Sequence, residues 1–330
     1  SLLTEKRMRY LIMPTYGYGS SRLGGVYKGI YSFYPKTRKL TKVNLSFEYK
    51  RNALPTSPRN GYFDKLEPKV TFVLNKNKPT KHKFTLRYSA TKMFVPEFST
   101  LKNEYLTATY NVKNKRVVHP FAGSANAQVI NGRHGKVWVD FIQKFTLDRE
   151  ENTIDVRLFG GVFFGQKATD LTHRFRLNAG NGANAVISSG GDVVNRGMTD
   201  YLYDEVYLAR FHSSTNFLSQ QVSTKDGGFR TGLFLGANNS WMTSINVTVP
   251  SPTKYVSVFA DGGLYPGGEK VAFVYAGGIQ LNIIKDVLEV YFPFTFSPSI
   301  RSNYEAVGLN QYAQKIKFLF NVGQYYDALD

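Results

Sequence analysis

The sequence predicts an all-β fold, an antiparallel transmembrane β-barrel of about 14 strands within a range of about 12–16. Three observations point to this fold. Apolar and polar residues alternate along most of the chain, the alternating segments are long, and tyrosines recur where the apolar faces end. Strands of about 9–11 tilted residues cross a bilayer, whereas strands of globular proteins more often have about 5–6 residues. The length of the segments therefore favours strands that cross a membrane.

Two adjacent strands are predicted most clearly between Val271 and Ser297. The apolar face of the first strand consists of Val271, Phe273, Tyr275, Ile279, Leu281 and Ile283. After the polar pair Lys285-Asp286, a second apolar face consists of Leu288, Val290, Phe292, Phe294 and Phe296. Alternation with a period of two gives each strand one apolar face and one polar or small face. Two such strands joined by a tight polar turn predict a β-hairpin.

The same alternation marks the other predicted strands. The clearest of them is 42–50, where Val43, Leu45, Phe47 and Tyr49 share one face. In chain order, the remaining predicted strands lie at 8–18, 23–33, 70–74, 83–91, 106–113, 119–129, 136–147, 153–164, 174–178, 229–235, 241–249, 255–260 and 315–322. The alternation is interrupted at 180–228, where we expect a long irregular insertion. We expect residues 1–330 to form a single barrel domain that contains this insertion.

Composition limits the classes of protein that the chain can belong to. It has 330 residues, 42 Lys and Arg against 24 Asp and Glu, and no Cys, so a disulfide scaffold and a thiolate metal site are excluded. No apolar run is long enough for a transmembrane helix. The net charge of +18 suits nucleic acid, anionic lipid or a basic lumen. The basic residues do not cluster into one patch, so we expect no nucleic-acid partner.

The apolar faces are predicted to meet lipid. We expect the lipid-facing residues of the last strands to be Leu288, Val290, Phe292, Phe294, Phe318 and Phe320. Tyrosines at the ends of these faces are typical of an interfacial girdle, in which the ring lies among headgroups and the hydroxyl is hydrated. Ordinary core aromatics of a soluble β-sandwich are the alternative interpretation.

The opposite faces carry many long basic side chains. We predict that a hydrated lumen is lined by Lys42, Arg87, Arg157, Arg174, Arg176, Lys315 and Lys317. Solvated outer faces of a soluble sheet explain the same charges equally well.

The sequence shows no recognisable catalytic chemistry. It contains no H-E-x-x-H, no phosphate-binding G-x-x-x-x-G-K-[ST] and no G-x-S-x-G, and its five histidines are scattered. Asp226-Gly227-Gly228 and Asp261-Gly262-Gly263 are typical of turns. We therefore predict no catalytic residue, no cofactor and no metal site, and a chain that is not itself an enzyme.

Several strings resemble a known family. They are YPK (34–36), DVRLFGGVFF (155–164), HRFRL (173–177), YDEVYLAR (203–210), FLSQQVSTKDGGFR (217–230), WMTSINVTVPSP (241–252) and AGGIQLNIIKDVLEVYFPFTFS (276–297). Together they resemble the C-terminal region of large Bacteroidota membrane proteins, in which a gluzincin-type metallo-aminopeptidase-like domain precedes an outer-membrane β-barrel. The resemblance implies a Gram-negative outer-membrane barrel that is truncated at its N-terminus. It carries over no peptidase activity, because the zinc-binding domain is missing from this sequence.

The predicted function follows from the pattern and the resemblance. We expect a multi-pass β-barrel of the cell outer membrane, either the membrane-embedded part of a peptidase-like protein or a subunit of a cell-envelope complex. Its expected partners are outer-membrane lipid, lipopolysaccharide and other envelope proteins. The alternative is a porin or transporter with a basic, anion-preferring lumen, and a soluble all-β binding module is a third class.

Overall fold

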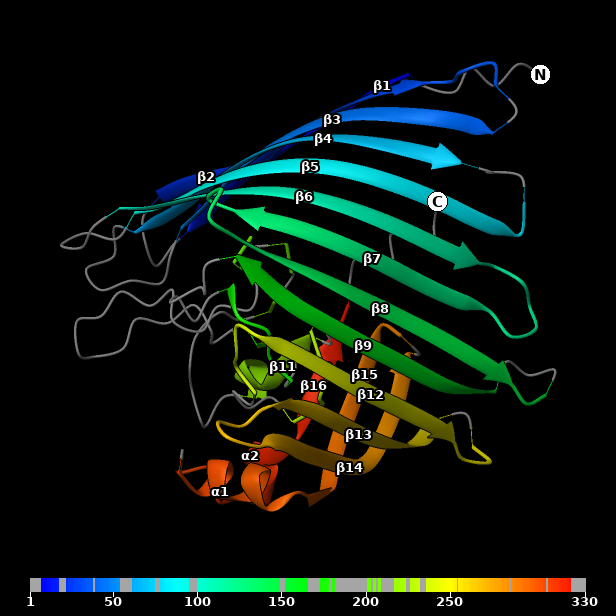
Figure 1. Ribbon diagram of the computed structural model, residues 1–330, viewed down its shortest axis with the longest axis vertical. Coiled ribbons are helices and arrows are strands. Elements are labelled where there is room, and N and C mark those ends of the chain that lie inside the picture. The colour runs from blue at the N-terminus through cyan, green and yellow to red at the C-terminus, as the bar shows by residue number, and fades with distance from the viewer. Residues whose placement is uncertain are drawn as a thin grey trace. The chain divides into compact units, whose positions relative to one another are not determined.

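Figure 1 shows a computed structural model of the chain. The structure describes residues 7–17, 22–37, 39–53, 61–74, 78–94, 100–148, 152–165, 173–177, 180–181, 201–202, 204–205, 207–208, 217–223, 226–231, 236–253, 255–284, 286–306 and 308–321. Within these residues the chain forms a 16-stranded sheet with hydrogen-bonded neighbours in the order β1-β2-β3-β4-β5-β6-β7-β8-β9-β12-β13-β14-β15-β16-β11-β10. The prediction of an all-β, mainly antiparallel fold is confirmed.

Two compact units make up the chain, and each is described by itself. The first comprises Ser1–Arg116, Phe121–Val137 and Phe164–Gln166, and the second comprises Val117–Pro120, Trp138–Phe163 and Lys167–Asp330. The single barrel domain predicted for residues 1–330 stays a prediction. The predicted insertion at 180–228 lies largely outside the described residues.

The first unit is built from long antiparallel strands in sequential order. They are β1 (Met8–Gly17), β2 (Arg22–Phe33), β3 (Leu40–Ala53), β4 (Tyr62–Leu74), β5 (Thr80–Phe94), β6 (Leu101–Asn114) and β7 (Phe121–Ile130), followed by the first residues of β8 (His134–Thr146). The register pairs Val43 with Phe72, and Phe72 with Phe84. Because directly opposed residues of neighbouring strands point to the same side of the sheet, the apolar residues of these strands share one face.

The second unit contains the remaining strands and all the described helices. Its elements are the rest of β8, β9 (Thr153–Gly165), β10 (Gly180–Asn181), η3 (Phe217–Gln220), β11 (Gln221–Ser223), β12 (Trp241–Pro250), β13 (Val256–Pro266), β14 (Val271–Ile284), β15 (Leu288–Phe296), α1 (Pro298–Ala306), α2 (Tyr312–Lys315) and β16 (Lys317–Phe320). Strands β9 and β12 to β16 pair antiparallel, whereas β11 pairs parallel with β16. The hairpin predicted at Val271–Ser297 is confirmed as β14 and β15, and Asp286 in its turn has a φ of +62°.

Three predicted strands have a different structure. Of the strand predicted at 229–235, the described residues 229–231 form no named strand and belong to a turn. Residues 174–178 form no named strand in their described part, and a single bridge joins Phe175 to Asn238. Their alternation arises because Phe175 and Leu177 both insert into the core of the second unit. The last strand begins at Lys317 instead of Lys315, because Lys315 ends the short helix α2.

Candidate functional site

One face of the strands in each unit exposes large apolar side chains. In the first unit, Tyr31 of β2, Leu45 of β3 and Leu86 of β5 are exposed. In the second unit, Phe273 and Phe294 are 62% and 60% exposed. Folded soluble monomers rarely expose contiguous apolar surface on this scale, so such a face marks contact with a membrane or a partner.

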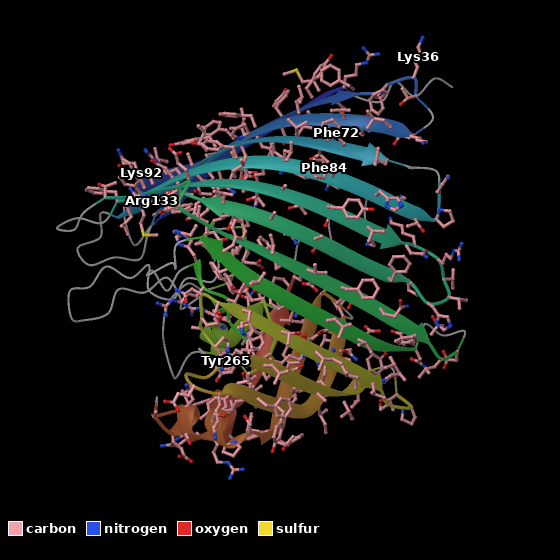
Figure 2. The ribbon with its side chains drawn as sticks, in the orientation of Figure 1. Lys36, Phe72, Phe84, Lys92, Arg133 and Tyr265 are labelled. Atoms are coloured by element: carbon pink, nitrogen blue, oxygen red, sulfur yellow. The ribbon has the colours of Figure 1, made fainter. Side chains whose placement is uncertain are left out.

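Figure 2 shows how side-chain types are distributed along the strands of the first unit. Phe72 and Phe84 lie on the adjacent strands β4 and β5, where their rings stack with centroids 6.3 Å apart. Lys92 lies near the C-terminal end of β5, and Arg133 lies in the connection between β7 and β8. Cations at the ends and aromatics between them are the order that a strand crossing an apolar layer requires.

The opposite face of the first unit carries a buried ladder of ion pairs. Glu67 on β4 is 3% exposed, and it lies within 3.3 Å of the Lys65 ammonium and 3.7 Å of the Lys69 ammonium and the Arg87 guanidinium. The Ser89 hydroxyl donates a hydrogen bond of 3.0 Å to the same carboxylate. Arg87 and Ser89 belong to β5 and bind this carboxylate of β4, so the ladder joins two neighbouring strands and holds them in register.

In the second unit, Arg157 of β9 anchors the turn at 226–231 against the polar face of the sheet. Its guanidinium donates two hydrogen bonds to Asp140 of β8, at 2.9 and 2.7 Å, and a third of 3.0 Å to the side-chain oxygen of Asn246 on β12. It also donates to the backbone carbonyl of Asp226. The predicted turn at Asp226-Gly227-Gly228 is present, and its partner is this arginine.

Asp261 lies within β13, so the prediction that Asp261-Gly262-Gly263 forms a turn is wrong. Its fully buried carboxylate accepts hydrogen bonds of 3.0 Å from the Asn246 amide and from the backbone N–H of Arg230. Asp next to Gly is typical of turns, but here the Asp binds a segment that packs on the sheet and the Gly leaves room for it. The two roles cannot be told apart from the sequence. The Arg230 guanidinium lies over the rings of Phe259 and Tyr291, at 4.9 and 5.7 Å from their centroids.

A hydrophobic cluster encloses the same region of the second unit. It consists of Phe159, Phe175, Leu177, Phe229, Met242, Val274, Ala276, Ile300 and Tyr304. A Cβ at Gly263 would overlap Leu177 and Phe229, so the glycine allows these side chains to reach the strand. Tyr304 of α1 donates a 2.8 Å hydrogen bond to the carbonyl of Thr231, and burial raises the pKa of its phenol, which keeps the donor protonated. Segments 173–177 and 226–231 and helix α1 therefore fill this face of the sheet.

Gly228 offers a direct test of how closely the 226–231 turn approaches Arg157. Its φ of +68° and the contact that a Cβ would make with the Arg157 guanidinium both disfavour a side chain. We expect Gly228→Ala to lower the free energy of unfolding by about 2 kcal/mol, measured by denaturant titration in detergent. Gly132→Ala is the matched control, because Gly132 has a φ of +62° and open space around it. Equal losses in the two variants would show that Arg157 does not crowd Gly228.

The seven basic residues predicted to line a lumen lie in different surroundings. Arg157 is bound by one carboxylate, one side-chain amide oxygen and one backbone carbonyl as described, Arg87 pairs with Glu67, and Lys42 lies 5.5 Å from the ring centroid of Tyr34. Arg174 is half-buried and Arg176 is buried in the 173–177 segment. Lys315 lies over the Tyr304 ring from α2, and Lys317 is buried and donates to the Gln314 carbonyl. Among the described contacts, these seven residues do not form a common cluster.

The six residues predicted to face lipid lie on one face of β15 and β16. The register pairs Val290 with Leu281 and Phe318, and Phe292 with Ile279. Phe294 is the most exposed of the six, and Leu288, Val290, Phe292 and Phe320 are half-buried. Phe318 differs, because it is only 3% exposed beneath the ring of Phe217.

No group of three or more His, Asp or Glu in the part of the chain that the structure describes is arranged to hold a metal ion. No helix in the described ranges is long and apolar enough to cross a membrane.

Comparisons with known proteins were made for sequence and for structure. No protein-family model matches the sequence, and no curated protein matches it. Similar solved structures include BamA from Haemophilus ducreyi lacking POTRA domains 1–3, with a TM-score of 0.43 and 11% identity over 94% of this chain and 69% of that chain. CdiB from Acinetobacter baumannii has a TM-score of 0.40 and 11% identity over 90% of this chain. The chain spans about half, 51%, of the length of that CdiB.

Sequence reasoning missed the network that fixes the 226–231 turn. Asp140, Asn246 and Asp261 occupy polar-face positions on β8, β12 and β13, in line with Arg157 on β9. One signal in the sequence could have found them. Acids and an amide occur on predicted strands close to that of the arginine, at positions that the alternation places on the same face.

Proposed function

We propose that this chain is an outer-membrane β-barrel domain that has no enzymatic activity of its own. One observation carries the proposal: long antiparallel strands expose large apolar side chains on one face while charged and polar groups are buried on the other. In water this arrangement would leave the apolar face uncovered, whereas in a bilayer it is the favourable one. The strands, many of 10–15 residues, are long enough to cross the apolar layer at a tilt.

The cellular role that we propose is the membrane-embedded part of a peptidase-like protein, or a subunit of a cell-envelope complex. It rests on the sequence resemblance to Bacteroidota proteins with a metallo-aminopeptidase-like domain. Outer-membrane lipid and lipopolysaccharide are the proposed surroundings of the exposed face, and other envelope proteins are the proposed partners.

The alternative of an anion-preferring pore finds less support in the second unit. There the polar face is packed against 173–177, 226–231 and α1, and Arg157 is neutralised by Asp140. Such groups stabilise a packed interior, so we propose a structural use for them. Planar-bilayer recordings check this point, and a steady anion-selective current from the isolated chain would favour the pore.

Membrane insertion is tested by refolding the chain into detergent or lipid and comparing heated with unheated samples on a denaturing gel. We expect heat-modifiable migration and no folded, monodisperse product without detergent. Ile279 is exposed near the middle of β14, and Ile279→Arg should lower the free energy of unfolding by about 2–4 kcal/mol, the cost of a cation at mid-bilayer.

The matched control for that variant is Glu269→Arg in the turn before β14, where the side chain is exposed at the end of the strand. This change should have little effect on folding in lipid. A wild-type chain that folds as a soluble monomer, or an Ile279→Arg variant as stable as Glu269→Arg, would contradict the proposal.

A further inference from the structure

Strand β16 ends the antiparallel series of the second unit, and its outer edge is covered from within the chain. On one edge it pairs with β15, where Phe318 lies opposite Val290. On the other edge β11 runs parallel, with Gln221 opposite Phe318 and Val222 opposite Leu319. The β9–β12 connection thus supplies a strand to the side of β16 that β15 does not reach.

Side-chain contacts also hold this added strand in place. Val222 is 1% exposed and packs with Phe259, Tyr291 and Leu319. The Gln221 amide donates a 3.2 Å hydrogen bond to the Phe320 carbonyl, and the Gln220 amide donates one of 3.0 Å to the Ala313 carbonyl. Val222 and Gln221 are adjacent in β11, so their side chains make these contacts on opposite sides of the backbone. Such contacts are typical of a strand that is packed into the sheet.

The segment also changes which side chains reach the apolar face. Phe318 shares that face with Val290, yet the ring of Phe217 stacks on it with centroids 4.7 Å apart. Phe217 and Leu218 of η3 are themselves exposed. The apolar face therefore continues past β16 through η3, with Phe217 in the position that the alternation of β16 assigns to Phe318.

We propose that Phe217–Ser223 is a membrane-embedded stave of the barrel, in which β11 covers the edge of β16 and η3 presents Phe217 and Leu218 to lipid acyl chains. Backbone N–H and C=O groups at a strand edge have no water to bind in the apolar layer, so an edge at that depth needs a partner. β11 is that partner. This inference rests on the proposed membrane function and goes beyond it, because it places part of the β9–β12 connection within the bilayer.

Acyl-chain contact is tested with tryptophan probes in lipids brominated on their chains. The two natural tryptophans are replaced by Trp138→Phe and Trp241→Phe, and Phe217→Trp is compared with Phe273→Trp, a probe on the exposed face of β14. We expect brominated chains to quench a comparable fraction of the emission at both probes. Quenching at Phe273→Trp alone, with Phe217→Trp quenched by aqueous iodide, would overturn the inference and leave the membrane function standing. Quenching at neither probe would reject the membrane function, and the inference with it.

The pairing itself is tested by disulfides, since the chain has no cysteine of its own. Val222→Cys with Leu319→Cys joins register partners, and we expect this pair to cross-link in the folded protein without added oxidant other than air. Val222→Cys with Lys317→Cys is the control, because a shift of two residues adds roughly 6.6 Å along the strand and exceeds disulfide reach. No cross-link in the first pair, or equal cross-linking in both, would show that β11 does not hold this edge.

Discussion

Replacement of Arg157 by alanine is expected to lower the free energy of unfolding by about 3 kcal/mol, because it leaves a carboxylate, an amide and a carbonyl without their shared donor. The side chain of Arg157 is 11% exposed and that of Asp140 is 31% exposed, which places the cost at the lower end of the range for buried pairs. Denaturant titration in detergent, followed by tryptophan fluorescence, measures the loss. Trp138 packs against the adjacent hydrophobic cluster and reports on the same region.

Arg157→Lys is the control that separates charge from geometry. Lysine keeps the charge but cannot bind both Asp140 oxygens while it also reaches Asn246, because it lacks the planar fork of donors. We expect this variant to recover less than half of the loss. Full recovery by lysine would show that charge alone holds the turn, and an Arg157→Ala variant of wild-type stability would show that the turn is anchored elsewhere.

The strands could be predicted from the sequence because their signal is local. In β15 every second residue is apolar, and the same period runs through most of β14 and the central parts of β3 and β5. This period follows from backbone geometry alone. The same rule gave a wrong strand at 174–178, because Phe175 and Leu177 alternate with arginines for a different reason, insertion into a core. Periodicity identifies which side chains share a face, but it does not identify what covers that face.

The candidate site could not be predicted in the same way because its contacts are not local. Arg157 binds Asp140 and Asn246, which are 17 and 89 positions away in the chain. Phe318 shows the same limit: its face on β16 follows from alternation, but Phe217, which covers it, comes from a distant connection. Such partners are fixed by strand order and by segments that fold back on the sheet, which a single sequence does not encode in its period.

Replacement of Asp261 by alanine is expected to destabilise the second unit by about 4 kcal/mol, because it removes a buried carboxylate and leaves the buried Arg230 without its acidic partner. The backbone N–H of Arg230 and the amide of Asn246 lose their acceptor as well. Limited trypsin digestion provides a local readout besides unfolding. Arg230 is buried in the folded chain, so we expect cleavage after it to be slow in the wild type and much faster in Asp261→Ala.

Asp261→Asn is the matched control for this prediction, since it keeps the shape and one acceptor oxygen but loses the charge. That oxygen can still accept from the Arg230 N–H, while the new amide group faces the Asn246 amide as a second donor. We expect an intermediate loss of stability and an intermediate rate of cleavage. If Asp261→Ala unfolds earlier but trypsin still spares Arg230, the carboxylate stabilises β13 without fixing the turn, and the hydrophobic contacts of Phe229 are then what hold the 226–231 turn on the sheet.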